Sequence, residues 1–189
     1  MTRIVAGTLG GRTLAVPPAG TRPTSERVRE ALFSRLDHLD ALRDARVLDG
    51  YAGSGALGLE AISRGAASVT LVELGRAAAE VCRRNVADLG LRDRAQVVKD
   101  TVEAFVARPV TQPWDLVLLD PPYDVPAATV DAILLALVPA LAEDAVVVVE
   151  RSARSTAPTW PDGLADLGTK TYGETVVHLA ERVADDPRR

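Results

Sequence analysis

The residues best suited to chemistry form the tetrapeptide Asp120-Pro121-Pro122-Tyr123, which follows an apolar run over 114–119. Neither proline has an N–H, so the Asp120 carboxylate and the Pro121 carbonyl could accept both hydrogens of an exocyclic amine on a nucleobase. Such an amine is a poor nucleophile because its lone pair is delocalised into the ring, and two acceptors would free that lone pair. Tyr123 would stack on the flipped-out base. Taken alone, the tetrapeptide is more often a plain strand-ending turn. Methylation of a base amine is favoured here because the tetrapeptide follows the fourth strand of a chain that also has a glycine-rich motif.

A glycine-rich stretch over 47–60 predicts a buried strand, a tight turn and the start of a helix. Gly53, Gly55 and Gly58 match the G-x-G-x-x-G spacing, and Glu73 ends the next apolar run. Glycine lets the backbone approach a ligand closely because it has no Cβ. An acid after the second strand can bind the ribose of a dinucleotide or of S-adenosylmethionine (SAM). This motif alone leaves both cofactors, and a purely structural turn, open.

The composition is that of one domain with a sizeable core, since 47% of the 189 residues are hydrophobic. No apolar run approaches the ~20 residues of a membrane helix, and the N-terminus has no signal-peptide pattern. We therefore expect a cytoplasmic protein with no membrane partner. The single cysteine, Cys82, excludes an internal disulfide. One cysteine and two histidines argue against a metal site.

The charge of the chain is unevenly distributed. Residues 1–36 hold six arginines and two glutamates, a net charge of +4, whereas the remainder holds 16 basic and 24 acidic side chains, a net charge of −8. An arginine-rich arm on an acidic body is what contact with RNA phosphates requires. The alternative is an ordinary solvated helix face.

Alternating strand and helix patterns predict an α/β fold with a mostly parallel, seven-stranded sheet. Strands are expected at 46–50, 68–73, 95–99, 114–119 and 145–149, and helices at about 25–42, 56–64, 75–89, 101–107 and 126–138. A final antiparallel hairpin is expected at 164–172 and 175–181, and a small N-terminal one over 3–16. The final hairpin is typical of SAM-dependent methyltransferases, because dinucleotide-binding Rossmann domains continue with another parallel crossover. We predict an N-terminal RNA-binding extension (1–22), a Rossmann-like class I methyltransferase domain (23–183) and a frayed tail (184–189).

With these motifs in place, the chain resembles the RsmD family, the bacterial 16S ribosomal RNA guanine-N2 methyltransferases. The matching stretches are Arg3–Gly7, Arg22–Phe33, Gly50–Ala61, Val72-Glu73 and Asp120–Tyr123. They lie in the family's order and spacing over nearly the full length. The arginine-rich stretch separates this family from DNA amino-methyltransferases better than the tetrapeptide does.

The resemblance implies a role for each matching position, with SAM as cofactor and 16S rRNA in an assembled or partly assembled small subunit as partner. A monomer is the default expectation, which no residue pattern tests. Asp49, Gly53 and Gly55 are expected at the methionine end of SAM, Glu73 at the ribose and Asp100 at the adenine. The other residues expected to bind the cofactor are Tyr51, Ser54, Leu74 and Thr101. Asp120, Pro121, Pro122 and Tyr123 would handle the target guanine. RNA contacts are implied for Arg3, Arg12, Arg22, Thr24, Arg27 and Arg29. Gly75 departs from the family, which often has a polar residue there, and this loosens the expected contacts with adenosine.

Three rival functions stay open at this point. A DNA adenine or cytosine methyltransferase would share the chemistry, but the chain is short for an added DNA-reading domain. An NAD-dependent oxidoreductase would share the glycine motif, but no hydride-transfer residues can be named. A non-catalytic RNA-binding assembly factor would keep the fold without the reaction.

Overall fold

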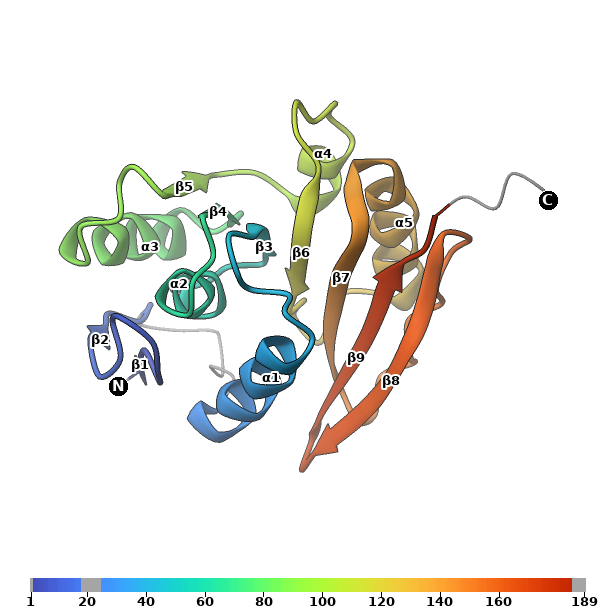
Figure 1. Cartoon of the computed structure of the whole chain (residues 1–189), viewed down its shortest axis with the longest axis horizontal. Coiled ribbons are helices and arrows are strands. Elements are labelled where there is room, and N and C mark those ends of the chain that lie inside the picture. Colours follow the sequence, from blue (N-terminus) through green and yellow to red (C-terminus); the bar gives the residue numbers. More distant parts are fainter. Residues whose placement is uncertain (1, 18–24, 185–189) are drawn as a thin grey trace.

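The computed structural model describes residues 2–17 and 25–184, and its centre is a seven-stranded sheet (Figure 1). The strand order is β5-β4-β3-β6-β7-β9-β8. These strands are β3 (Arg46–Gly50), β4 (Ser68–Val72), β5 (Ala95–Val98), β6 (Trp114–Leu119), β7 (Leu141–Ser152), β8 (Leu164–Tyr172) and β9 (Thr175–Arg182). The first five in chain order pair in parallel, and β9 pairs antiparallel with both β7 and β8. The predicted class I SAM-dependent methyltransferase fold is confirmed, because the reversed final hairpin replaces a further parallel crossover.

Helices cover both faces of the sheet (Figure 1). They are α1 (Glu26–His38), α2 (Ala56–Ser63), α3 (Arg76–Asp88), α4 (Val102–Val106), α5 (Ala127–Leu137) and the 3₁₀ turn η1 (Val138–Ala140). Apolar side chains of α1, α2 and α3 form one buried cluster with one face of the sheet, and those of α4 and α5 form a second cluster with the other. Two covered faces explain why the parallel strands are almost continuously apolar. None of the helices in the described part of the chain is long and apolar enough to span a membrane.

In the main domain, helix α1 and strand β7 differ from their predicted bounds by more than one residue at an end. Helix α1 ends at His38 rather than near Leu42, because Asp40 takes a left-handed conformation with φ of 53°. The N–H of Ala41 then bonds the carbonyl of Leu36 at 3.0 Å, which closes the end of the helix. Strand β7 is longer than the predicted 145–149, because it continues alongside β9 up to Ser152.

The N-terminal hairpin is smaller than expected and shares the core of the main domain. Its strands β1 (Thr2–Arg3) and β2 (Thr13–Leu14) have two residues each. Ile4 and Leu14 are buried in the same apolar cluster as α1, α2 and α3. Burial of these side chains removes apolar area from water and so binds the segment to the domain. The RNA-binding role of residues 1–22 stays a prediction.

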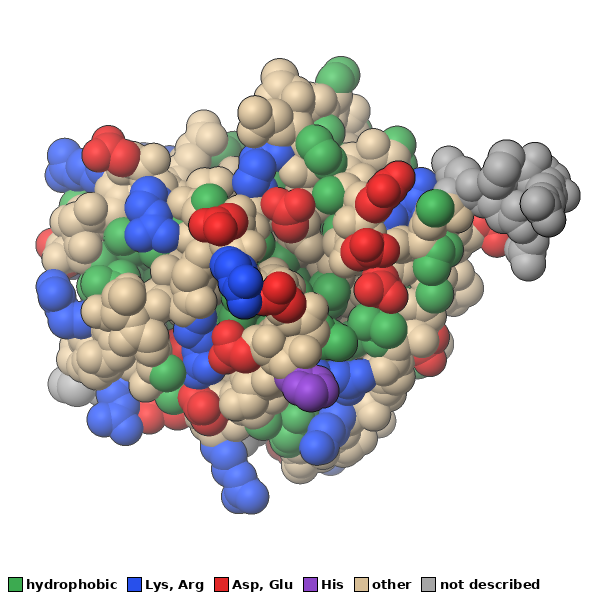
Figure 2. Space-filling view, viewed as in Figure 1, with side chains coloured by type: hydrophobic (Ala, Val, Ile, Leu, Met, Phe, Trp, Pro, Cys, Tyr) green, Lys and Arg blue, Asp and Glu red, His purple; other side chains and the backbone are tan. Residues whose placement is uncertain are grey.

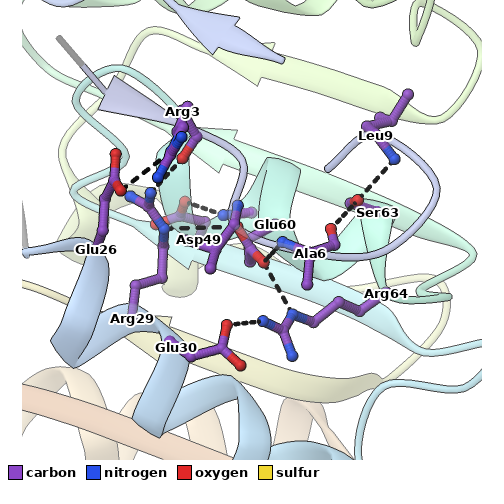
Figure 3. Close-up of polar contacts among 12 residues, drawn as sticks. Arg3, Ala6, Leu9, Glu26, Arg29, Glu30, Asp49, Glu60, Ser63 and Arg64 are labelled. Atoms are coloured by element: carbon purple, nitrogen blue, oxygen red, sulfur yellow. Dashed lines mark hydrogen bonds and ion pairs between the residues drawn. The ribbon is translucent and has the colours of Figure 1, made fainter. Parts of the chain in front are cut away.

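Side chains of α2 hold the backbone of this segment, as Figure 3 shows. The Glu60 carboxylate accepts hydrogen bonds from the N–H groups of Val5 at 2.7 Å and Ala6 at 3.0 Å. The Ser63 hydroxyl accepts one from the N–H of Leu9 at 3.0 Å. The segment therefore satisfies its backbone groups through α2 rather than through a longer strand pairing.

A buried ion pair joins α1 to the same point (Figure 3). Arg29 Nε lies 3.5 Å from Glu60 Oε2, and the two side chains are 1% and 0% exposed. Arg29 also donates to the carbonyl of Arg3, while Arg64 bonds the second Glu60 oxygen at 2.8 Å. A direct contact with RNA, predicted for Arg29, is incompatible with this burial. Arg29 instead fixes α1 against α2 and the N-terminal segment.

Candidate active site

A cleft of about 880 Å³ opens at the carboxyl ends of the parallel strands. This is the edge at which open α/β sheets bind ligands, and the volume lies in the upper part of the usual range for small-molecule sites. Of the residues predicted to bind cofactor or base, those lining the cleft are Asp49, Tyr51, Gly53, Glu73, Leu74, Asp100, Thr101 and Asp120–Tyr123. The fold therefore brings together motifs that lie up to 74 positions apart in the chain.

The glycine turn between β3 and α2 has a backbone conformation that residues with a side chain rarely adopt. Gly55 has φ of 83°, and a Cβ there would lie 2.9 Å from the sulfur of the buried Cys82. The turn is also tied to α3, because the Asn85 amide donates to the Ser54 carbonyl at 2.8 Å. The same Asn85 side chain donates to the carbonyl and accepts from the N–H of Ala15, both at 2.9 Å. Asn85 thus links the glycine turn, α3 and the N-terminal segment.

Asp49 is a buried carboxylate at the end of β3. Its Oδ2 accepts a 2.8 Å hydrogen bond from the N–H of Gly58, whereas its Oδ1 is buried without a hydrogen-bond partner among the described residues. Burial is the main cause that raises the pKa of Asp49 to about 8; the Gly58 hydrogen bond lowers this pKa, and the nearby Asp120 and Glu73 carboxylates add to the increase. A cation with an N–H donor would satisfy this atom, as the methionine ammonium of SAM would.

Glu73 and Asp100 lie in the part of the cleft where adenosine is expected. Glu73 accepts the N–H of Gly53 at 2.8 Å and the N–H of Gly75 at 2.6 Å, so it joins the glycine turn to the start of α3. Asp100 accepts the N–H of Thr101 at 2.9 Å and forms an ion pair with Arg108. Carboxylate acceptors at these two places match the hydroxyls of a ribose and the amine of an adenine.

The tetrapeptide follows β6 and is held in a closed turn. The N–H of Val125 donates to the carbonyl of Pro122 at 3.0 Å, and Arg151 Nη2 donates to the carbonyl of Val125 at 3.0 Å. Tyr123 is 68% exposed, so its ring is available to a ligand rather than used in the core. Asp120 lines the cleft beside it.

Several lining residues were missed by the sequence analysis. They include Ser25, which caps α1, Val28 on α1, Glu150 and Arg151 on β7, and Tyr172 and Thr175 on the last hairpin. Glu150-Arg151 could have been found, because a polar residue directly after an apolar strand is the signal that marked Asp49 and Asp120. Nothing local identifies the residues of α1 or the hairpin, which reach the cleft through tertiary packing.

Apart from the buried Arg29, the predicted RNA-contacting residues are either exposed or outside the described part of the chain. Arg27 is exposed on α1, and Arg3 and Arg12 are exposed on the N-terminal segment. Arg3 pairs with Glu26 at 3.1 Å. Arg22 and Thr24 lie outside the described residues. On the face seen in Figure 2, basic side chains gather on the half that contains the N-terminal segment and α3. Contact of these residues with RNA stays a prediction.

The family model described as "Conserved hypothetical protein 95" matches residues 2–181. The ribosomal RNA small subunit methyltransferase D of Escherichia coli is 39% identical over 183 residues, which cover 96% of this chain and 90% of that protein. The chain belongs to the RsmD family. A solved structure titled putative methyltransferase yhhF, also from E. coli, is 37% identical and superposes with a TM-score of 0.86 over 97% of this chain and 99% of that one. The putative rRNA methyltransferase YlbH of Bacillus subtilis is 30% identical, over 95% of this chain and 98% of that protein.

Membership of the RsmD family decides between the cofactors that the glycine motif left open. This RsmD-family protein is a methyltransferase, and the methyl donor predicted from the sequence, SAM, is confirmed. The donors and acceptors of the cleft fit the group: Asp49 Oδ1 lacks a hydrogen-bond partner among the described residues, and the Glu73 and Asp100 carboxylates line the same cleft. Within the described residues, no three His, Cys, Asp or Glu side chains lie together as a metal ion would need.

Proposed function

We propose that this RsmD-family methyltransferase transfers a methyl group from SAM to the N2 amine of one guanine in 16S rRNA. The substrate is a small subunit, assembled or partly assembled, and the enzyme acts as a monomer. The observation that carries the proposal is the position of Asp120: it ends β6 in the same cleft as Asp49, with the exposed Tyr123 beside it. The relatives named above support the RNA class, since one is named for small-subunit ribosomal RNA and another for rRNA.

In the proposed mechanism, Asp120 and Pro121 position the target amine for methyl transfer. SAM supplies a methyl carbon activated by its bond to a sulfonium. Asp120 and the Pro121 carbonyl accept the two N2 hydrogens, which directs the nitrogen lone pair toward that carbon. When bound, SAM would supply the methyl group, and the electrons of its C–S bond would leave with S-adenosylhomocysteine. The Asp120 carboxylate would then accept one N2 proton. No strong base is needed because the methylated ammonium is acidic, so positioning supplies most of the rate.

The test is transfer of labelled methyl from SAM to small ribosomal subunits purified from cells that lack this gene. Naked rRNA and duplex DNA are assayed in parallel, and modified nucleosides are identified by mass spectrometry. We expect N2-methylguanosine on the subunits. Label in DNA would instead identify a DNA amino-methyltransferase, and absence of any label with SAM binding intact would identify an RNA-binding assembly factor.

The variant Asp120→Ala tests the proposed role of the tetrapeptide. We expect loss of methyl transfer with SAM binding retained. Glu143→Ala is the matched control, because Glu143 is an exposed acid in β7 away from the cleft lining. Turnover by Asp120→Ala equal to that of the control would contradict the mechanism.

A further inference from the structure

Three adjacent strands each bring a carboxylate to the same face of the sheet at the cleft. Val47, Leu118 and Val148 belong to the apolar cluster under α1, α2 and α3. Side chains two positions apart on a strand point to the same face, so Asp49, Asp120 and Glu150 follow these residues on that face. Asp49, Asp120 and Glu150 all line the cleft.

Glu150 lies next to Asp120 and on the far side of it from Asp49. Leu119 pairs with Val149 in the parallel register, so the following residues, Asp120 and Glu150, are level on strands about 4.8 Å apart. The strand order β3-β6-β7 places Asp120 between the other two carboxylates. Asp49 faces the expected methionine end of the cofactor, and Glu150 therefore faces the base.

Glu150 is held rigidly and is largely removed from water. It is 7% exposed, and its strand is paired on both sides, with Val177 of β9 directly opposite Glu150. The turn between β8 and β9 forms the outer wall of this part of the cleft through Tyr172 and Thr175. A fixed, desolvated carboxylate discriminates strongly between ligands, because a ligand that presents an acceptor atom to it is repelled, whereas one that presents an N–H is bound.

Guanine has a donor pattern that two neighbouring carboxylates match. Its Watson–Crick edge carries the N2 amine next to N1–H, whereas in adenine and cytosine the ring nitrogen next to the amine is an acceptor. A carboxylate only accepts hydrogen bonds. We propose that Glu150 accepts the N1–H of the flipped guanine while Asp120 and Pro121 hold its N2 amine, and that Glu150 thereby makes the site specific for guanine. This inference rests on the proposed function and names the residue that selects its base.

The test exchanges both the residue and the base. The target guanine, once mapped, is replaced by 2-aminopurine in 16S RNA that is ligated and reconstituted into subunits. 2-Aminopurine keeps the exocyclic amine but has an acceptor at N1. The amide of Glu150→Gln can donate a hydrogen bond to that acceptor. The alanine of Glu150→Ala can neither donate to it nor accept from the N1–H of guanine. We expect Glu150→Gln to raise the ratio of kcat/KM for 2-aminopurine to that for guanine at least tenfold over wild type.

The controls separate base selection from a structural effect. We expect SAM affinity within about twofold of wild type in both variants, and no rise in the ratio for Glu150→Ala. The missing O6 of 2-aminopurine affects all variants equally, so it cancels in the comparison. An unchanged ratio in Glu150→Gln, with wild type still forming N2-methylguanosine, would overturn the role of Glu150 alone. No N2-methylguanosine from wild type would overturn the proposed function, and this inference with it.

Discussion

Asp49 and Gly58 are joined across the glycine turn by a 2.8 Å hydrogen bond that uses one carboxylate oxygen and leaves the other buried without a partner among the described residues. The bond fixes the side chain, and it requires α2 to lie close to the sheet. A Cβ on Gly58 would lie 2.5 Å from Leu71, so glycine is needed for this approach. The arrangement produces a rigid acceptor for the cofactor.

The first prediction concerns SAM affinity as a function of pH. The pKa of Asp49 is raised to about 8, so this acid is mostly protonated in the free protein below that pH. Because the methionine ammonium favours the ionised form, binding releases a proton, and affinity should rise with pH up to about 8. The slope should approach tenfold per pH unit below 7. Isothermal titration calorimetry from pH 6 to 8.5 measures it.

The variant Asp49→Asn is the control for this effect. Asp49→Asn should bind SAM more weakly than wild type at pH 8, and its SAM affinity should hardly change between pH 6 and 8.5. A wild-type affinity that is constant from pH 6 to 8 would contradict the assigned protonation of Asp49.

The second prediction concerns the buried ion pair between Arg29 and Glu60. Glu60→Ala leaves the Arg29 charge buried and removes the acceptor for two backbone N–H groups. The free energy of unfolding should fall by about 3–5 kcal/mol. Urea denaturation measures it, with Glu80→Ala as control: Glu80 pairs with Arg83 at 2.9 Å on the surface of α3, and its loss should change stability by less than about 1 kcal/mol. Equal effects from the two variants would be inconsistent with a buried pair.

The third prediction concerns Asp100 and Arg108. Arg108 is more than half exposed and forms an ion pair with one carboxylate oxygen of Asp100. Asp100 is also the residue expected to accept a hydrogen bond from the adenine amine, so Arg108 competes with the cofactor. Asp100→Ala should weaken SAM binding about tenfold, because it removes an acceptor. Arg108→Ala should strengthen binding by up to about fivefold at low salt, since an exposed pair contributes about 0–1 kcal/mol. Weaker binding by Arg108→Ala would instead assign Arg108 a direct role with the cofactor.

The fourth prediction concerns Tyr123. Stacking of a base on an aromatic ring contributes about 1–3 kcal/mol, so Tyr123→Ala should lower kcat/KM for ribosomal subunits by about 5- to 150-fold. Tyr123→Phe keeps the ring and should stay within about threefold of wild type. The melting temperature should not change in either variant, because the side chain is 68% exposed. If Tyr123→Phe loses as much activity as Tyr123→Ala, the hydroxyl rather than stacking is responsible.

Much of the sheet could be predicted because its signals are local. The apolar runs at β3 and β6 have the predicted bounds, since a strand covered on both faces must be apolar at nearly every position. The turns around Gly55 and Pro121 were recognisable because glycine and proline constrain their own backbone. The end of α1 could not be predicted. The helix is ended by Asp40 in a left-handed conformation, and the sequence has no glycine or proline at that point to signal it.

The sequence by itself determined the succession of strands and helices along the chain, the glycine turn and the tetrapeptide, all of which depend on residues close together in the chain. The tertiary structure alone decided the positions of Arg29 and Glu150. In the sequence, Arg29 is indistinguishable from the other arginines of the basic N-terminal stretch. In the structure it is buried, where it pairs with Glu60 and donates to the carbonyl of Arg3. Glu150 lines the cleft beside Asp120 because β7 pairs with β6 in a register that matches Val149 with Leu119. Such relationships join residues about 30 positions apart, and they arise only when the whole core packs.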